Sequence, residues 1–180
     1  MNLPYNTLTN WAWADITDIA KSELGKTLDR NKNIGKPCNY LCALNVKWGT
    51  FDFSILKHIL LEDSERERYL VRNGDLLICE GGDVGRAAIW ESSEEIYYQN
   101  ALHRVRFRDE LCPYFYLYVL QHYKYVGLID KVSGGVTIKH FTQNSMKKIL
   151  FPVPPINEQK RISNKVSEIF TKLDSIMADL

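Results

Sequence analysis

The chain has 180 residues, of which 45% are hydrophobic and 25% are charged, and its formal net charge is +1. This length suits one domain with an appendage. The small net charge argues neither for nor against a nucleic-acid partner, because the distribution of charge decides that question. No apolar run approaches the ~20 residues that span a bilayer, and the N-terminus lacks the features of a signal peptide. We therefore expect a soluble, cytoplasmic chain with no membrane partner.

The cysteines and histidines predict neither a metal site nor a bound cofactor. Cys38 and Cys42 are four residues apart, but no second pair completes a zinc site. The four histidines show no metal-ligand spacing either. We expect the four thiols to be reduced and partly buried, as in a cytosolic protein.

The first third of the chain predicts short elements. Residues 11–20 suggest an early strand or turn, and residues 21–37 are rich in Lys, Gly and Asn, which is typical of a loop. Residues 40–53 are β-branched and aromatic, so we expect a strand that ends near Gly49. Residues 63–69 are polar and predict a short helix or a turn.

In the middle of the chain, turn residues and alternating apolar and basic side chains predict several strands. Asn73-Gly74-Asp75 lies between two apolar runs, so residues 69–82 predict two strands joined by a tight turn. Glycines then precede a short strand over 86–90. Residues 101–107 alternate apolar and basic side chains with one slip, which favours a strand with one basic face.

The next segment predicts helices and one more strand. The aromatic run that begins at Pro113 suits a buried helix, because proline is tolerated in the first turn. Residues 132–141 predict a glycine-containing loop, and Thr142 predicts the cap of a short helix. The run from Ile149 predicts a strand closed by prolines.

The C-terminal segment predicts a long helix that begins around Asn157, a plausible N-cap. About 24 helical residues would span roughly 36 Å. The apolar residues repeat at steps of four and three, which is a heptad stripe that pairs with another helix. The stripe consists of Ile162, Val166, Ile169, Leu173, Ile176 and Leu180. The alternative is a terminal helix folded back on its own domain.

The sequence offers no recognisable catalytic constellation. It contains no P-loop, no GxSxG and no HExxH motif. The run "GGDVGR" precedes a strand, whereas a phosphate cradle needs a helix N-terminus. Pro154-Pro155 does not form the motif of an adenine methyltransferase, and Glu158-Gln159-Lys160 alone is weak evidence for a nuclease. We therefore predict no catalytic residues.

The sequence offers more residues suited to binding nucleic acid than to catalysis. Seven of the nine arginines lie between Arg66 and Arg108, and arginines with nearby amides contact phosphates and base edges. The alternative for each residue is an ordinary exposed polar side chain. The predicted DNA contacts are Arg86, Gln99, Asn100, Arg104, Arg106, Thr137, Lys139 and His140.

Several motifs occur in an order that is specific as a set. They include "NGDLLICEGGDVGRAA", "QNALHRVRF", "PYFYLYVLQ", "SGGVTIKHFTQNSM" and "ILFPVPPINEQKRI". Across nearly its whole length the chain resembles one target-recognition domain, plus the following helix, of the specificity (S) subunit of type I restriction-modification enzymes. Full family members have two such domains and two helices.

The resemblance implies an α+β fold, with a twisted, mainly antiparallel sheet, flanking helices and a projecting coiled-coil helix. It divides the chain into a DNA target-recognition domain (1–155) and a spacer helix (156–180). It implies a non-catalytic subunit that reads half of a split double-stranded DNA target and docks the methyltransferase (M) and restriction (R) subunits. A homodimer through the helix would read a palindromic target. The alternatives are a recognition module of a fused methyltransferase-nuclease and a coiled-coil adaptor that binds protein.

Overall fold

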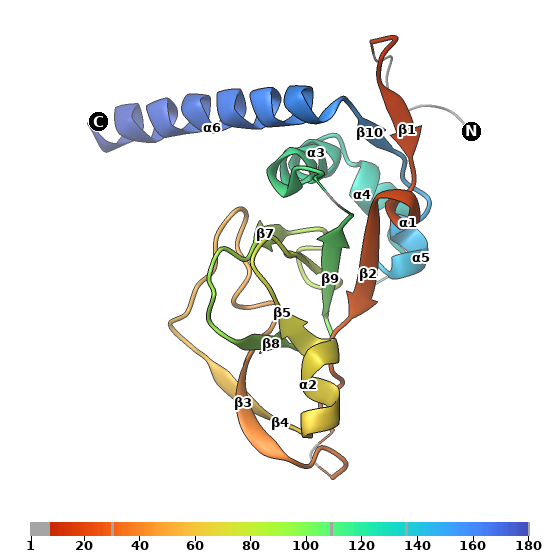
Figure 1. Ribbon diagram of the computed structural model, residues 1–180, viewed down its shortest axis with the longest axis vertical. Helices are drawn as coiled ribbons and strands as arrows, with labels where there is room; N and C mark the ends of the chain where they lie inside the picture. Colours follow the sequence, from red (N-terminus) through yellow and green to blue (C-terminus); the bar gives the residue numbers. More distant parts are fainter. Residues whose placement is uncertain (1–7, 30, 109, 136, 180) are drawn as a thin grey trace.

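The computed structural model describes residues 8–29, 31–108, 110–135 and 137–179 (Figure 1). Its helices are α1 (Ile16–Ile19), α2 (Asp63–Tyr69), α3 (Pro113–Tyr125), α4 (Leu128–Val132), α5 (Gln143–Met146) and α6 (Ile156–Ala178). Its strands are β1 (Ala12–Ala14), β2 (Ala20–Leu24), β3 (Lys36–Leu41), β4 (Lys57–Leu61), β5 (Leu70–Val71), β6 (Leu76–Cys79), β7 (Ala87–Ile89), β8 (Ile96–Tyr98), β9 (Leu102–Phe107) and β10 (Phe151–Val153).

The described strands form two four-stranded sheets and one pair. The sheet orders are β2-β9-β6-β7 and β4-β3-β8-β5, and β1 pairs with β10. Every strand pairing is antiparallel except that of β3 with β8. The α+β class that the sequence predicts is confirmed, with the strands divided between separate sheets.

Strand β6 connects two hydrophobic cores. All four of its side chains are buried, and successive side chains of a strand point to opposite faces. Leu76 and Ile78 pack with α3 and α4 in one core. Leu77 and Cys79 pack with β3 and β8 in the other. A continuous apolar run is typical of a strand covered on both faces.

Two predictions of local structure differ in part from the structure. The turn at Asn73-Gly74-Asp75 joins two strands, β5 and β6, as predicted, but these strands do not pair as a hairpin, because they belong to different sheets. Asp75 is 1% exposed and accepts a hydrogen bond from the Arg72 backbone N–H, so this turn enters the interior. The segment predicted to be a loop over 21–37 contains most of β2, whose polar residues pair with β9 at the edge of the sheet.

The strand predicted over 40–53 lies earlier, as β3, and ends at Leu41. Asn45 explains this end, because its buried amide organises a turn. Its Oδ1 accepts from the Cys42 backbone N–H at 2.9 Å, and its Nδ2 donates to the Asp52 and Ile55 carbonyls at 2.9 and 2.8 Å. Side-chain bonds of this kind compete with the ladder of a sheet.

The helical predictions are largely confirmed. Pro113 opens α3, and Thr142 caps α5 by accepting from the Ser145 backbone N–H. Helix α6 begins at Ile156 with Pro155 as its N-cap residue, so Asn157 lies inside the first turn rather than at the cap. Glu158 lies in the first turn, where the positive end of the helix dipole favours it.

Helix α6 is docked at its start and exposed beyond it. Gln159 is fully buried, accepts from the Cys112 backbone N–H at 3.0 Å and donates to the Pro154 carbonyl at 2.9 Å. Ser163 is also buried, and the Tyr118 and Phe170 rings lie 6.1 Å apart. Figure 1 shows the rest of the helix extending past α3. The division of the chain at residue 155 stays a prediction.

The predicted stripe follows the same division. Ile162 and Val166 are partly buried, whereas Ile169, Leu173 and Ile176 are 48%, 49% and 58% exposed. Leu180, the last member of the predicted stripe, lies outside the described residues. The fold-back alternative therefore describes only the first turns of the helix.

Candidate nucleic-acid interface

Three segments that are distant in the sequence meet at one end of β6 and β9. They are the glycine turn 80–86, the turn 99–101 and the loop 133–141, which we call together the loop face. The Glu80 backbone N–H donates to the Ala101 carbonyl at 2.9 Å, and the Phe141 N–H donates to the Glu80 carbonyl at 2.7 Å. A Cβ added to Gly81 would lie 3.9 Å from the His140 imidazole.

The turn 99–101 is held by backbone contacts. The Gln99 N–H donates to the Leu41 carbonyl, and the Asn100 N–H donates to the Lys26 carbonyl. Gly25 packs against the backbone of this turn. A Cβ added to it would lie 2.4 Å from the Gln99 carbonyl carbon, so only glycine fits there. Ala101 has φ of 101°, a strained value that persists only where the surroundings impose it.

The loop face therefore presents the two predicted amides from a constrained backbone. Gln99 and Asn100 are half-buried. Within the described part of the chain, neither side-chain amide has a hydrogen-bond partner. An amide without an internal partner, carried on a constrained backbone, suits bidentate contact with adenine.

The loop 133–141 is closed at its base and exposed at its tip. Gly134 and His140 exchange two backbone hydrogen bonds, of 3.1 and 2.7 Å. Gly135 has φ of 103°, and an added Cβ would collide with the Ile138 carbonyl oxygen. Thr137 and His140 are exposed, and Lys139 is about half exposed, with its Nζ 3.4 Å from Asp130 Oδ1. The structure therefore places three of the predicted contacts at the surface.

Arg104 requires a correction, because it is an interior residue. Its side chain is 4% exposed, donates to the Leu70 carbonyl and the Glu23 carboxylate, and lies over the Tyr98 ring. Partial burial raises the pKa of Glu23, but hydrogen bonds and charges from Lys21 and Arg104 outweigh it and hold that pKa below its usual value. Arg104 has no surface from which to reach a phosphate.

Arg106 and Arg86 also make internal contacts. Arg106 donates through two nitrogens to the two oxygens of Asp75, each at 2.7 Å, and this pair raises the pKa of the guanidinium. Arg86 donates to the Ala43 carbonyl at 2.7 Å, next to Cys79, whose pKa is raised to about 11 by burial. Both side chains are half-buried and stabilise the fold in this geometry.

The predicted basic face of β9 is therefore wrong. His103 is 1% exposed, and burial lowers its pKa to about 4. Its Nε2 lies 3.1 Å from the Phe141 carbonyl, which only accepts, so Nε2 carries the proton of a neutral ring. The imidazole fastens the base of the loop 133–141 to β9.

An ion network that sequence reasoning missed lies next to the loop face. Lys124 Nζ lies 3.1 Å from Asp83 and 3.3 Å from Asp130, and Asp130 also pairs with Lys139. Partial burial raises the pKa of Asp130, but the two lysines lower it further and keep the carboxylate charged. No local sequence pattern could have joined residues 83 and 124.

Metal and membrane features are absent within the described ranges. No group of three or more His, Cys, Asp or Glu side chains there could hold a metal ion. None of the described helices is both long enough and apolar enough to cross a bilayer.

The arrangement defines a class of protein: a mixed α+β domain that presents constrained polar loops and carries a helix with an exposed apolar stripe. Residues 9–179 match the type I restriction modification DNA specificity domain, and the chain belongs to that family. The resemblance identified from the sequence is therefore confirmed.

Curated relatives are specificity subunits. The chain is 26% identical over 170 residues to a putative type I restriction enzyme MjaX specificity subunit of Methanocaldococcus jannaschii, covering 90% of this chain and 39% of that one. It is 30% identical over 114 residues to the type I restriction enzyme EcoBI specificity subunit of Escherichia coli, and the match covers 63% of this chain and 23% of that one. The chain thus spans well under half the length of these relatives.

Solved structures share the fold. One described as showing complex assembly and conformational transition of the type I R-M system matches with a TM-score of 0.71 at 19% identity, covering 96% of this chain and 41% of that one. The HsdS subunit from Thermoanaerobacter tengcongensis matches with a TM-score of 0.69 at 17% identity, and the match covers 98% of this chain and 41% of that one.

Proposed function

We propose that this chain is a non-catalytic, cytoplasmic DNA-recognition subunit, or part of one, that reads one half of a split double-stranded DNA target. The observation that carries the proposal is the family match over residues 9–179. The catalytic steps would belong to methyltransferase and restriction subunits that dock on the complex, so the chain itself needs no cofactor.

The loop face is the surface that we assign to DNA. Gln99, Asn100 and Thr137 would read base edges, and Lys139 and His140 would contact phosphate or base. This assignment rests on their exposure or missing internal partners, and on a backbone that holds them in place. Arg86, which ends the glycine turn, would support this surface through its bond to the Ala43 carbonyl. Arg106 would instead stabilise the other end of β9 through Asp75.

Helix α6 is the surface that we assign to a second helix. Exposed apolar residues at heptad spacing are expensive to leave in water, and a partner helix would bury them. The partner would be a second spacer helix, either in a longer chain or in a second copy of this one.

A pairing test separates the stripe from the rest of α6. Leu173→Ser combined with Ile176→Ser should abolish association through the helix, while the free energy of unfolding of the monomer stays within about 1 kcal/mol, because both side chains are exposed there. Sedimentation velocity measures the association. Asp174→Ser, next to the stripe on the exposed face, is the matched control and should associate normally. Unchanged association of the double variant would remove the helix from the interface.

The test of function is selection from a random duplex library by this chain assembled with the methyltransferase subunit of its own system. Enrichment of a split motif is the expected result. A palindromic motif would indicate two copies of the chain, and an asymmetric motif would indicate a second recognition domain. An assembled complex that enriches no sequence would contradict the proposal and favour the coiled-coil adaptor. A methyltransferase encoded in the same reading frame would favour the fused module.

A further inference from the structure

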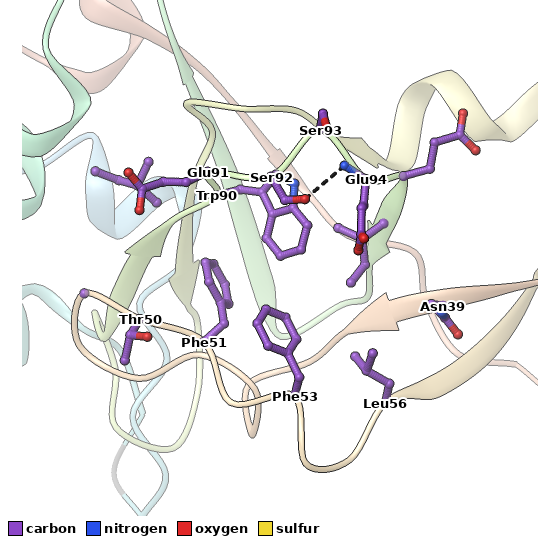
Figure 2. Close-up of a pocket in the computed structure, with 14 residues that line it drawn as sticks. Asn39, Thr50, Phe51, Phe53, Leu56, Trp90, Glu91, Ser92, Ser93 and Glu94 are labelled. Carbon is purple, nitrogen blue, oxygen red and sulfur yellow. Dashed lines mark hydrogen bonds between the residues drawn. The ribbon is translucent and has the colours of Figure 1, made fainter.

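A cleft of about 830 Å³ lies away from the loop face, between the loop after Gly49 and the segment after β7. The two sites are at opposite ends of β7, because the glycine turn 80–86 precedes this strand and Trp90 follows it. In Figure 2, Phe51, Phe53 and Leu56 rise from one side of the cleft, and Glu94 lies on the other.

One side of the cleft is aromatic. The rings of Phe51 and Phe53 lie 5.4 and 5.9 Å from that of Trp90, both edge to face, and 6.1 Å from each other. Trp90 is buried, and its indole N–H has no hydrogen-bond partner within the described chain. Phe53 is 50% exposed, so part of its ring is accessible to a ligand.

The other side of the cleft is acidic. Glu91, Glu94 and Glu95 all line it, and none of the lining residues is a lysine or an arginine. Glu91 accepts a hydrogen bond from the Tyr114 hydroxyl. Glu94 and Glu95 form no ion pair with any described residue. Three carboxylates without a cation would repel DNA phosphates and attract a positive group.

We propose that this cleft binds an arginine side chain of a protein partner. A guanidinium is planar and weakly hydrated, so it stacks on an aromatic face while its edge donates to carboxylates. The accessible part of the Phe53 ring provides that face, and Glu94 provides an acceptor opposite it. The apolar stem of an arginine would lie against Leu56. This inference does not depend on DNA recognition by the loop face.

The test is an NMR titration of the full ¹⁵N-labelled chain with N-acetyl-leucyl-arginyl-leucinamide. The control peptide contains citrulline, which keeps the shape of arginine and lacks its charge. The expected result is a shift of the Trp90 indole and of the backbone amides over 91–95 with the arginine peptide, and at least fivefold weaker binding of the citrulline peptide.

Variants test the two sides of the cleft separately. Phe53→Ala and Glu94→Gln should each weaken binding about fivefold or more, and both sites are exposed enough to keep the fold. Asp174→Asn on α6 is the matched control and should leave binding unchanged. Equal binding of the citrulline peptide would overturn the proposal, as would cleft resonances that do not move. Displacement of the peptide by duplex DNA would assign the cleft to nucleic acid instead.

Discussion

Strand β9 and the loop over residues 133–141 carry similar polar side chains and lie against each other, but they use them in opposite ways. On β9, Arg104 and His103 are almost fully buried and bound to internal acceptors. On the loop, Lys139 and His140 are exposed. Arg104 uses its charge to join the two sheets, because Leu70 belongs to β5, whereas Lys139 keeps an exposed charge that a partner can contact.

The difference teaches that an arginine in a recognition domain is informative only once its acceptors are known. Arg106 satisfies a carboxylate that is 1% exposed, so its loss would leave a buried charge without compensation. Lys139 faces a carboxylate at 3.4 Å that also pairs with Lys124, so its loss would leave that carboxylate paired.

The largest expected effect on the free energy of unfolding comes from removing an internal arginine of β9. Arg106→Ala should lower the free energy of unfolding by about 3–5 kcal/mol, because Asp75 would remain buried and unpaired. Urea denaturation measures this change. Arg72→Ala is the control, since its ion pair with Glu67 is mostly exposed and should contribute less than about 1 kcal/mol. Similar losses for the two variants would remove the distinction between internal and surface arginines.

The next largest effect is a dependence of the free energy of unfolding on pH, which arises from the buried His103 imidazole. The unfolded imidazole titrates near 6.5, but the folded one has a pKa of about 4. Between these values the unfolded chain binds a proton that the folded chain does not, so stability is full above the unfolded pKa and falls as pH decreases. The wild-type chain should lose about 2 kcal/mol between pH 7.5 and pH 5 through this group.

The variant that isolates this effect is His103→Gln, which should lose correspondingly less stability over the same pH interval. Denaturation at both pH values measures the difference. His58→Gln, an exposed histidine, should behave like the wild-type chain. An identical pH dependence in His103→Gln and wild type would show that the buried imidazole is not the group responsible.

The smallest effect on stability is expected on the loop. Lys139→Ala should change the free energy of unfolding by less than about 0.5 kcal/mol. If Lys139 contacts phosphate, the slope of log affinity against log salt should become shallower by about 0.9. Fluorescence anisotropy with the selected duplex measures the slope. Lys172→Ala, an exposed lysine of α6, is the control and should leave it unchanged. An unaltered slope for Lys139→Ala would remove it from the DNA contacts.

Local signals predicted much of the fold. Pro113 and Thr142 mark helix starts because their effects act within one turn. The resemblance of ordered motifs gave the α+β class and the family. The loop 133–141 followed from its glycines, and the exposure of Thr137, Lys139 and His140 agrees with the expected surface role.

The positions of the arginines could not be predicted locally. Arg104 finds Glu23 across 81 residues, and Arg106 finds Asp75 across 31, so each environment exists only after the sheets form. The polar strand β2 was missed for a similar reason, since pairing with β9 imposes its extended backbone. The acidic and aromatic cleft was missed because its two sides come from separate loops.

The buried amide of Gln159 fixes the start of α6, so a small change of angle there is amplified along the exposed length of the helix. From Gln159 the helix continues for about 28 Å to Ala178, so a tilt of about ten degrees at Gln159 would move the far end by about 5 Å. That displacement exceeds the ~3.4 Å rise of one base pair. Under the proposed function, in which α6 pairs with a second spacer helix, the two hydrogen bonds of Gln159, to Cys112 and Pro154, would set the angle that determines which base step a second recognition surface meets.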